Sequence, residues 1–170
     1  MADGEIDIRP LPPDFRDWPG LLVLIRSAFA SMDGVIDPPS SVHVLTPAGL
    51  AQKASAETIL VARLGKRIIG CVSLDDRGDH LYLGKLAIEP ASQARGIGRR
   101  LIDAAEAVAI AGGKQALELQ TRVELTGNQA FFTRLRFVET GRGVHPGFER
   151  PTTITYRRPI ATGPARGVSS

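Results

Sequence analysis

Apolar residues along the chain either alternate with polar ones or recur at helical spacing, in short segments that predict a series of strands and helices. A first strand is predicted at about residues 5–9, and Asp14 is predicted to cap the helix that follows. Thr46 and Pro47 combine an N-cap residue with a first-turn proline, which predicts a short helix to about residue 55. The apolar positions of the first helix are Trp18, Leu21, Leu22, Ile25 and Phe29.

The remaining segments predict strands that alternate with two more helices. Residues 58–64 and 67–74 predict a hairpin around Gly65 and Lys66, and a third strand ends at Pro90. The later segments are a helix at 92–113, a strand at 116–123, a helix from Thr126 or Asn128, a strand at 137–141 and a last strand at 152–160. This order predicts a mixed α/β layer fold with a βαβ crossover at residues 81–122.

Length and composition predict one domain at residues 1–160 and a flexible tail at residues 161–170, which is rich in Gly, Pro and Ser. The 43% hydrophobic and 23% charged residues exclude a disordered chain. Cys71 is the only cysteine, which excludes an intramolecular disulfide and Cys-rich zinc sites, and three dispersed histidines predict no metal site. No signal-peptide pattern and no apolar run of about 20 residues occurs, so we expect a cytoplasmic protein without membrane contact.

The charge of the chain is uneven. The net charge is +3, but residues 86–170 hold 12 basic and 7 acidic side chains, whereas residues 1–85 hold 9 and 11. The second half is therefore the expected place for an anionic ligand. The chain has no basic stripe interleaved with aromatic residues, so we expect no nucleic-acid binding.

A glycine-containing turn joins the third hairpin strand to the longest predicted helix. Glycines there let a ligand approach the backbone, and the free N–H groups of a helix N-terminus favour an anion such as a pyrophosphate. Arg95, Arg99 and Arg100 add positive charge beside Gly96 and Gly98. A P-loop is excluded because no GxxxxGK sequence occurs, and a Rossmann fingerprint is disfavoured because its third glycine is replaced by leucine.

Two segments resemble the GCN5-related N-acetyltransferase (GNAT) superfamily. Gln93, Gly96 and Gly98 match its Q/R-x-x-G-x-G/A signature, and residues 128–137 resemble its later Asn-containing region. The order of elements agrees from about residue 5 to residue 160. The resemblance implies an α/β fold with a central mixed, mostly antiparallel sheet of about 6–7 strands, about four helices, and a splay between the fourth and fifth strands.

The resemblance also implies acetyl-CoA as co-substrate, with a β-augmentation contact to the pantetheine arm and backbone amides around the pyrophosphate. The implied cofactor-binding residues are Leu86, Ala87, Ile88, Gln93, Ala94, Arg95, Gly96, Ile97, Gly98, Arg99, Asn128, Phe131 and Phe132. The chain departs from the family at Phe132, where a tyrosine that can protonate the leaving thiolate is often found, and at Arg136, which replaces a glycine.

Glu118 and His145 are the candidate catalytic residues. Glu118 is predicted to lie mid-strand beside the splay, and His145 lies in a loop that the resemblance places over the acceptor site. The structural alternatives are an ion pair of Glu118 with Lys85 or Arg122 and a loop-fixing hydrogen bond of His145. Tyr82 and Asp33 are further candidates for the base, with packing at a strand start and a solvated loop as their structural alternatives. Asp33 and Asp37 are candidates for binding an amine cation, and His43 and His80 are expected to have no role.

The resemblance implies an acetyl-CoA-dependent N-acetyltransferase that moves an acetyl group to a primary amine of a small molecule or peptide by direct attack on the thioester. An oxygen acceptor or a longer acyl chain fits the same residues. The alternative is a non-catalytic CoA-binding regulatory module, which Phe132 favours because it has no proton to give. A homodimer is possible by the same resemblance.

Overall fold

The computed structural model describes residues 5–160, so the tail expected at 161–170 lies outside the described residues. Within residues 5–160, seven strands and four α-helices follow one another in the predicted order. The strands are β1 (Ile6–Pro10), β2 (Thr58–Leu64), β3 (Arg67–Asp76), β4 (His80–Ile88), β5 (Ala116–Arg122), β6 (Val138–Gly143) and β7 (Thr153–Pro159). The helices are α1 (Trp18–Phe29), α2 (Pro47–Ala56), α3 (Ile97–Ala111) and α4 (Thr126–Arg134), with short 3-10 turns η1 (Ala30–Met32), η2 (Ser41–Val44) and η3 (Pro90–Arg95).

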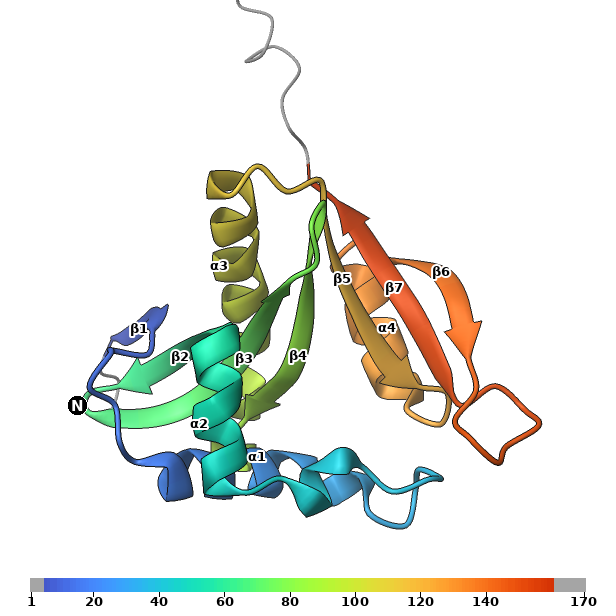
Figure 1. The fold of residues 1–170 in the computed structure, drawn as a ribbon, viewed down its shortest axis with the longest axis horizontal. Coiled ribbons are helices and arrows are strands. Elements are labelled where there is room, and N and C mark those ends of the chain that lie inside the picture. The colour runs from blue at the N-terminus through green and yellow to red at the C-terminus, as the bar shows by residue number, and fades with distance from the viewer. Residues whose placement is uncertain (1–4, 161–170) are drawn as a thin grey trace, which may run out of the picture.

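The strands form one sheet in the order β1-β2-β3-β4-β5-β7-β6. All neighbouring strands are antiparallel except β4 and β5, which are parallel. Their pairing covers only three positions, from His80 opposite Ala116 to Tyr82 opposite Glu118. Beyond these pairs the two strands separate, and Figure 1 shows the sheet opening into a V below this point. The predicted mixed sheet with a splay between its fourth and fifth strands is confirmed.

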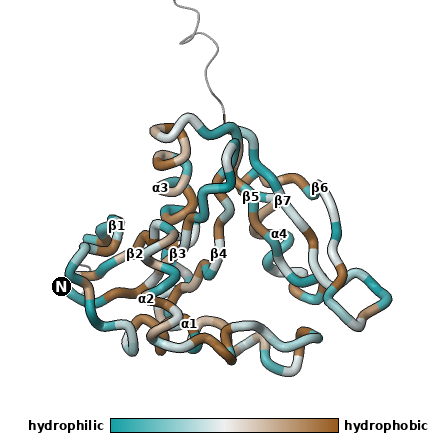
Figure 2. The backbone as a smooth tube through the Cα atoms, in the orientation of Figure 1, coloured by the Kyte–Doolittle hydropathy of each residue, from teal (hydrophilic) through white to brown (hydrophobic). Residues whose placement is uncertain are grey.

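The two faces of the sheet are covered by different helices. The larger core holds the buried stripe of α3, the inward residues of β2 to β5 and Phe132 of α4. The smaller core packs α1 and Leu50 of α2 against β2, β3 and β4. Figure 2 shows brown, apolar positions along α1 and α3, in line with the burial of one face of each. The smaller core therefore belongs to the arm that contains β2 to β4, whereas the larger core contains residues of both arms of the V.

Two predicted helix starts are wrong. The first helix begins at Trp18, and its cap is Asp17, whose Oδ1 accepts a hydrogen bond from Gly20 N at 3.1 Å; Asp14 lies outside it. The helix predicted from residue 92 begins at Ile97, because residues 90–95 form η3 and Gly96 has a left-handed φ of 73°. A residue in that conformation interrupts a right-handed helix.

Candidate active site

A cleft of about 710 Å³ opens where β4 and β5 separate. Its walls come from both strands, from the Gly96 turn at the start of α3, from α4, from the segment between α1 and α2, and from His145. Among the predicted site residues, those that line it are Leu86, Ile88, Gln93, Gly96, Gly98, Arg99, Asn128, Phe131, Phe132 and His145. Glu118, Ala87 and Ile97 do not line it: Ala87 and Ile97 are buried in the two cores.

Strand β4 carries a bulge on the cleft wall. Its register with β3 runs from Gly84 opposite Ser73 to Ala87 opposite Cys71, so Lys85 and Leu86 face a single residue of β3. Lys85 has a φ of 48°, which is rare for a residue with a side chain. Bulges re-aim side chains next to functional sites, and here Lys85 lines the cleft, where its Nζ donates a hydrogen bond to Ser41 Oγ at 2.8 Å.

The glycine turn needs both of its signature glycines for structural reasons. Gly96 adopts the left-handed conformation, which favours glycine. Gly98 has a packing role, because a Cβ built on it would lie 3.3 Å from the ring of Phe131. Gln93 ties the turn to the strand, since its Nε2 donates to the Ile88 carbonyl at 3.2 Å. The helix start and its neighbouring cleft wall are thereby held close together.

The predicted phosphate-binding arginines separate in the structure. Arg99 lines the cleft. Arg100 is exposed and its Nη2 donates to the Ile6 carbonyl of β1 at 2.9 Å, so this guanidinium holds the first strand. The exposed Arg95 stands at the end of η3, directly before Gly96. Positive charge at the mouth of α3 therefore comes from fewer side chains than the sequence indicated.

Helix α4 brings Asn128 and two aromatic rings to the cleft. Asn128 Nδ2 donates to Thr121 Oγ1 of β5 at 3.4 Å, which fixes the helix to the far arm of the V. Phe132 is only 7% exposed, and its ring packs against Phe137 with centroids 5.8 Å apart. Phe132 is thus mainly a core residue, and Phe131 is the more exposed of the two rings.

His145 reaches the cleft from the loop between β6 and β7. Its Nδ1 lies 2.5 Å from Thr152 Oγ1, and its backbone N–H donates to the same oxygen at 2.9 Å. Thr152 is fully buried, and its hydroxyl also faces the Gly143 carbonyl at 3.4 Å. The loop-fixing hydrogen bond and a place on the cleft wall therefore occur together at His145.

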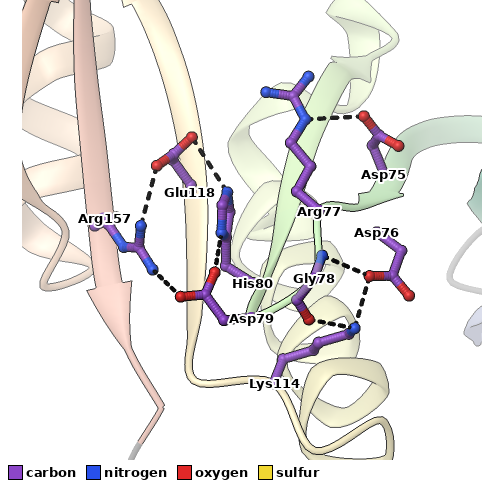
Figure 3. A network of polar contacts seen from close by, with 9 residues as sticks. All are labelled: Asp75, Asp76, Arg77, Gly78, Asp79, His80, Lys114, Glu118 and Arg157. Atoms are coloured by element: carbon purple, nitrogen blue, oxygen red, sulfur yellow. Dashed lines mark hydrogen bonds and ion pairs between the residues drawn. The ribbon is translucent and has the colours of Figure 1, made fainter.

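Glu118 belongs to a polar network at the closed end of the V, which Figure 3 shows between β4, β5 and β7. Its Oε2 lies 3.4 Å from Arg157 Nη1 and its Oε1 lies 3.5 Å from His80 Nε2. The predicted partners, Lys85 and Arg122, are wrong, and His80, for which no role was expected, joins this network. His80 Nδ1 also contacts Asp79 at 2.7 Å, and this hydrogen bond is the main reason that the pKa of Asp79 is lowered.

The loop between α1 and α2 is tied to the far arm of the V. Arg122 of β5 donates to the carbonyls of Pro38 at 2.5 Å and Pro39 at 3.1 Å. Asp37 lies 3.7 Å from Arg150, which lies at the same distance from Glu124. These contacts place one wall across the open end of the V, and Pro39 lines the cleft.

The two other candidate carboxylates, Asp33 and Asp37, do not line the cleft. Asp33 pairs with His43 at 2.8 Å on the surface, and Asp37 pairs with Arg150. Tyr82 does line the cleft; burial raises the pKa of its phenol, and Arg77 stacks over its ring at 4.0 Å. Among residues 5–160 there is no cluster of His, Cys, Asp or Glu that could hold a metal ion.

Three residues of the site have no role that the sequence indicates. From the sequence, Lys85 and Arg122 are expected only as partners of Glu118, and Thr152 only as part of the last strand. In the structure Lys85 binds Ser41, Arg122 binds Pro38 and Thr152 contacts His145. A buried threonine directly after Pro151 gives no distinct signal in the sequence. A lysine beside a glycine in a strand, as in Gly84-Lys85, is a weak sign of a bulge.

Within the described part of the chain, no helix has the length and apolar character needed to cross a membrane.

Solved structures of other proteins share this fold. The ribosomal-protein-S18-alanine N-acetyltransferase of Escherichia coli superposes with a TM-score of 0.70 and 19% identity, over 92% of this chain and 94% of that one. A Bacillus anthracis chain solved in complex with acetyl coenzyme A gives a TM-score of 0.57 and 23% identity, over 61% and 62% of the two chains.

Sequence comparison gives the family. An IAA acetyltransferase of Azospirillum brasilense is 30% identical over 110 residues, which cover 64% of this chain and 71% of that protein. The family profile described as Acetyltransferase (GNAT) family matches residues 23–137, which include β2 to β5, the glycine turn and α4. Because this match spans more than half of the sequence and contains the cleft strands, the chain belongs to the GNAT family of acetyltransferases.

Proposed function

We propose that the chain is an acetyl-CoA-dependent N-acetyltransferase in which the amine attacks the thioester directly. The observation that carries this proposal is the early end of the β4–β5 pairing at Tyr82 and Glu118. Beyond it, β4 runs along the cleft toward the Gly96 turn without β5 beside it. The names of two relatives, an N-acetyltransferase and a chain solved with acetyl coenzyme A, support the choice of reaction and co-substrate.

The cleft offers complementary sites for the two ends of acetyl-CoA. The pantetheine arm is extended and amide-bearing, so it can add to β4 at Leu86 and Ile88 as a strand would. The pyrophosphate fits the N–H groups at the start of α3, a helix of 15 residues, with Arg99 beside it. The thioester then lies toward the vertex of the V, between β4 and β5.

His145 is the proposed general base. The Thr152 hydroxyl has one proton, and when it is donated to the Gly143 carbonyl, Oγ1 accepts from both the backbone N–H and Nδ1–H of His145. This arrangement leaves Nε2 as the unprotonated nitrogen that can take a proton from the amine. Thr152 is then a positioning residue that selects the tautomer.

The charge of the cleft helps the amine to lose its proton. No aspartate or glutamate is among the described residues that line the cleft, whereas Lys85, Arg99 and Arg122 are. Nearby cations disfavour the ammonium form, so the free amine is more abundant in the cleft than in water. The nitrogen then forms a bond to the thioester carbonyl carbon, the amine proton passes to His145, and the carbon–sulfur bond breaks as the thiolate leaves.

The departure of the thiolate does not require a protein acid. Phe132, at the position where relatives often have a tyrosine, has no proton to give and is packed in the core. A thiol has a pKa near 8.5, so a thiolate is a stable leaving group close to neutral pH. The protein therefore needs to do two things: hold the amine close to the thioester, and remove a proton from the amine.

Thiol release from acetyl-CoA across a panel of primary amines tests the function. We expect His145→Gln to lower kcat by about a hundredfold, the usual effect of losing a general base, with unchanged acetyl-CoA affinity by calorimetry. His43→Gln is the matched control, because His43 pairs with Asp33 on the surface outside the cleft. Acetyl-CoA binding without thiol release for any amine would instead support the non-catalytic CoA-binding module. No binding at all would refute both functions.

A further inference from the structure

The charges on the cleft wall point to the nature of the acceptor. The cations among the described lining residues are Lys53, Lys85, Arg99 and Arg122, and no carboxylate accompanies them there. Lys53 is already paired, since its Nζ lies 3.0 Å from Glu57 Oε2. Arg99 stands at the start of α3, at the end proposed for the pyrophosphate. Lys85 and Arg122 remain for the acceptor half of the cleft.

Lys85 is built into the wall by the bulge in β4. Its φ of 48° is a strained backbone conformation, and its carbonyl accepts a hydrogen bond from the Cys71 thiol at 3.5 Å. The half-buried ammonium donates to the hydroxyl of Ser41, a neutral partner. Burial lowers the pKa of Lys85, with nearby Lys53 adding to this effect and Glu57 opposing it. A carboxylate beside this ammonium would supply the charge-assisted bond that a hydroxyl does not.

Arg122 supports the same region from the far arm of the V. Its guanidinium donates to two carbonyls, those of Pro38 and Pro39, which are neutral acceptors. The nearest acids, Asp37 and Glu124, each lie 3.7 Å from Arg150. Arg122 therefore holds the loop that contains Pro38 and Pro39 in place. Its positive charge adds to the potential of the cleft that it lines.

The wall of the cleft also carries apolar side chains. Phe29, the last residue of α1, and Met32 and Ile36, which follow it, line the cleft together with Ser31, Ser40 and Ser41. Ile36 is 8% exposed, whereas Phe29 and Met32 are partly exposed. A wall of this kind takes up an aliphatic or aromatic group rather than a polar chain.

We propose that the acceptor is a small amine that carries a carboxylate and an apolar group, as an apolar amino acid does, and that Lys85 and Ser41 bind the carboxylate. This inference rests on the proposed N-acetyltransferase function. It selects among acceptors, because the terminal amine of a peptide has no carboxylate on the same residue unless the chain ends there. The amine nitrogen of such an acceptor is left for the thioester.

The experiment compares acceptors with and without an anionic group. Thiol release from acetyl-CoA is measured with phenylalanine and phenethylamine, which differ only in the carboxylate, and with O-phosphoethanolamine and ethanolamine, which differ only in the phosphate. Loss of one charge-assisted hydrogen bond is worth about tenfold or more, so we expect phenylalanine to exceed phenethylamine in kcat/KM by at least about tenfold. We expect Lys85→Met to remove this preference through KM and Lys85→Arg to keep most of it. Lys66→Met, in the exposed turn between β2 and β3, is the matched control.

A second readout does not need turnover. Calorimetry in the presence of CoA compares N-acetylphenylalanine with N-acetylphenethylamine, and we expect the carboxylate form to bind at least about tenfold more tightly, with the difference lost in Lys85→Met. Equal binding of the two compounds, or a preference that survives Lys85→Met, overturns the anion site. The ratio of kcat/KM between O-phosphoethanolamine and ethanolamine is compared with the ratio between phenylalanine and phenethylamine. A larger ratio for the phosphate pair shows that the site prefers phosphate, and this result also overturns the proposed carboxylate site. No thiol release with any amine refutes the proposed function, while the binding comparison still decides whether the anion site exists.

Discussion

The polar network at the vertex predicts that Glu118 stabilises the fold and takes no part in proton transfer. Its carboxylate, 17% exposed, pairs with Arg157 and His80 at 3.4 and 3.5 Å. A pair on the surface contributes up to about 1 kcal/mol, and breaking a buried pair costs about 3–5 kcal/mol. For these partly buried pairs we expect Glu118→Gln to lower the free energy of unfolding by about 2 kcal/mol.

Thermal unfolding followed by circular dichroism measures this loss. At about 2–4 °C per kcal/mol for a chain of this size, the expected decrease in Tm is about 4–8 °C. Glu139→Gln is the control, because Glu139 forms an exposed ion pair with Arg142 at 2.8 Å, and we expect a loss below about 0.5 kcal/mol. kcat/KM for acetyl transfer should stay within about twofold of the parent value in both variants. An unchanged Tm combined with a hundredfold loss of kcat would refute this reasoning and make Glu118, rather than His145, the base.

Three further outcomes follow from the turns and strands around the cleft. Gly96→Ala should lower the free energy of unfolding in urea by about 1 kcal/mol, because the residue has a φ of 73°. Gly127→Ala, in α4 with open space around it, should raise this free energy by about 0.5 kcal/mol, and changes of the same sign in both variants would contradict the prediction. Burial raises the pKa of the Cys71 thiol to about 12, so a thiol reagent at neutral pH should label it only after unfolding, and rapid native labelling would contradict this. Burial lowers the pKa of Lys85 below 10.5, the ordinary value for lysine, so the binding of N-acetylphenylalanine should weaken before the pH reaches 10.5. The Lys85→Arg variant should keep its affinity over the same pH range. An affinity of the parent protein that does not change with pH would disprove the contact with Lys85.

The elements were predictable from the sequence because their signals are local. Five positions at helical spacing were expected to form the buried stripe of α3, and four of them are fully buried: Ile97, Leu101, Ala105 and Ala109. The hairpin turn at Gly65 has the expected strands on both sides. The N-cap of α1, Asp17, was also predictable from the sequence. Proline is tolerated in the first turn of a helix, so Pro19 favours Asp17 over Asp14, which would place the ring farther inside.

The wall of the cleft was not predictable, because its contacts join distant parts of the chain. Arg122 binds Pro38 and Pro39 across 84 and 83 residues, and Lys85 reaches Ser41 across 44. Glu118 was correctly placed on the polar face of its strand, yet its partner Arg157 lies 39 residues away on β7. Spacing in the sequence gives the face of a strand, but the neighbours of that face depend on the strand order.

The short pairing of β4 with β5 gives the sheet two internal edges in addition to the outer edges at β1 and β6. Exposed edges invite strands of other molecules, which is the usual route to aggregation. Here the internal edges diverge from a pinned vertex, so a flat strand can follow one of them but cannot bridge both. The loop held by Arg122 also stands across the open end. A V-shaped break thus makes unpaired backbone tolerable in the middle of a sheet and accessible to a slender extended ligand.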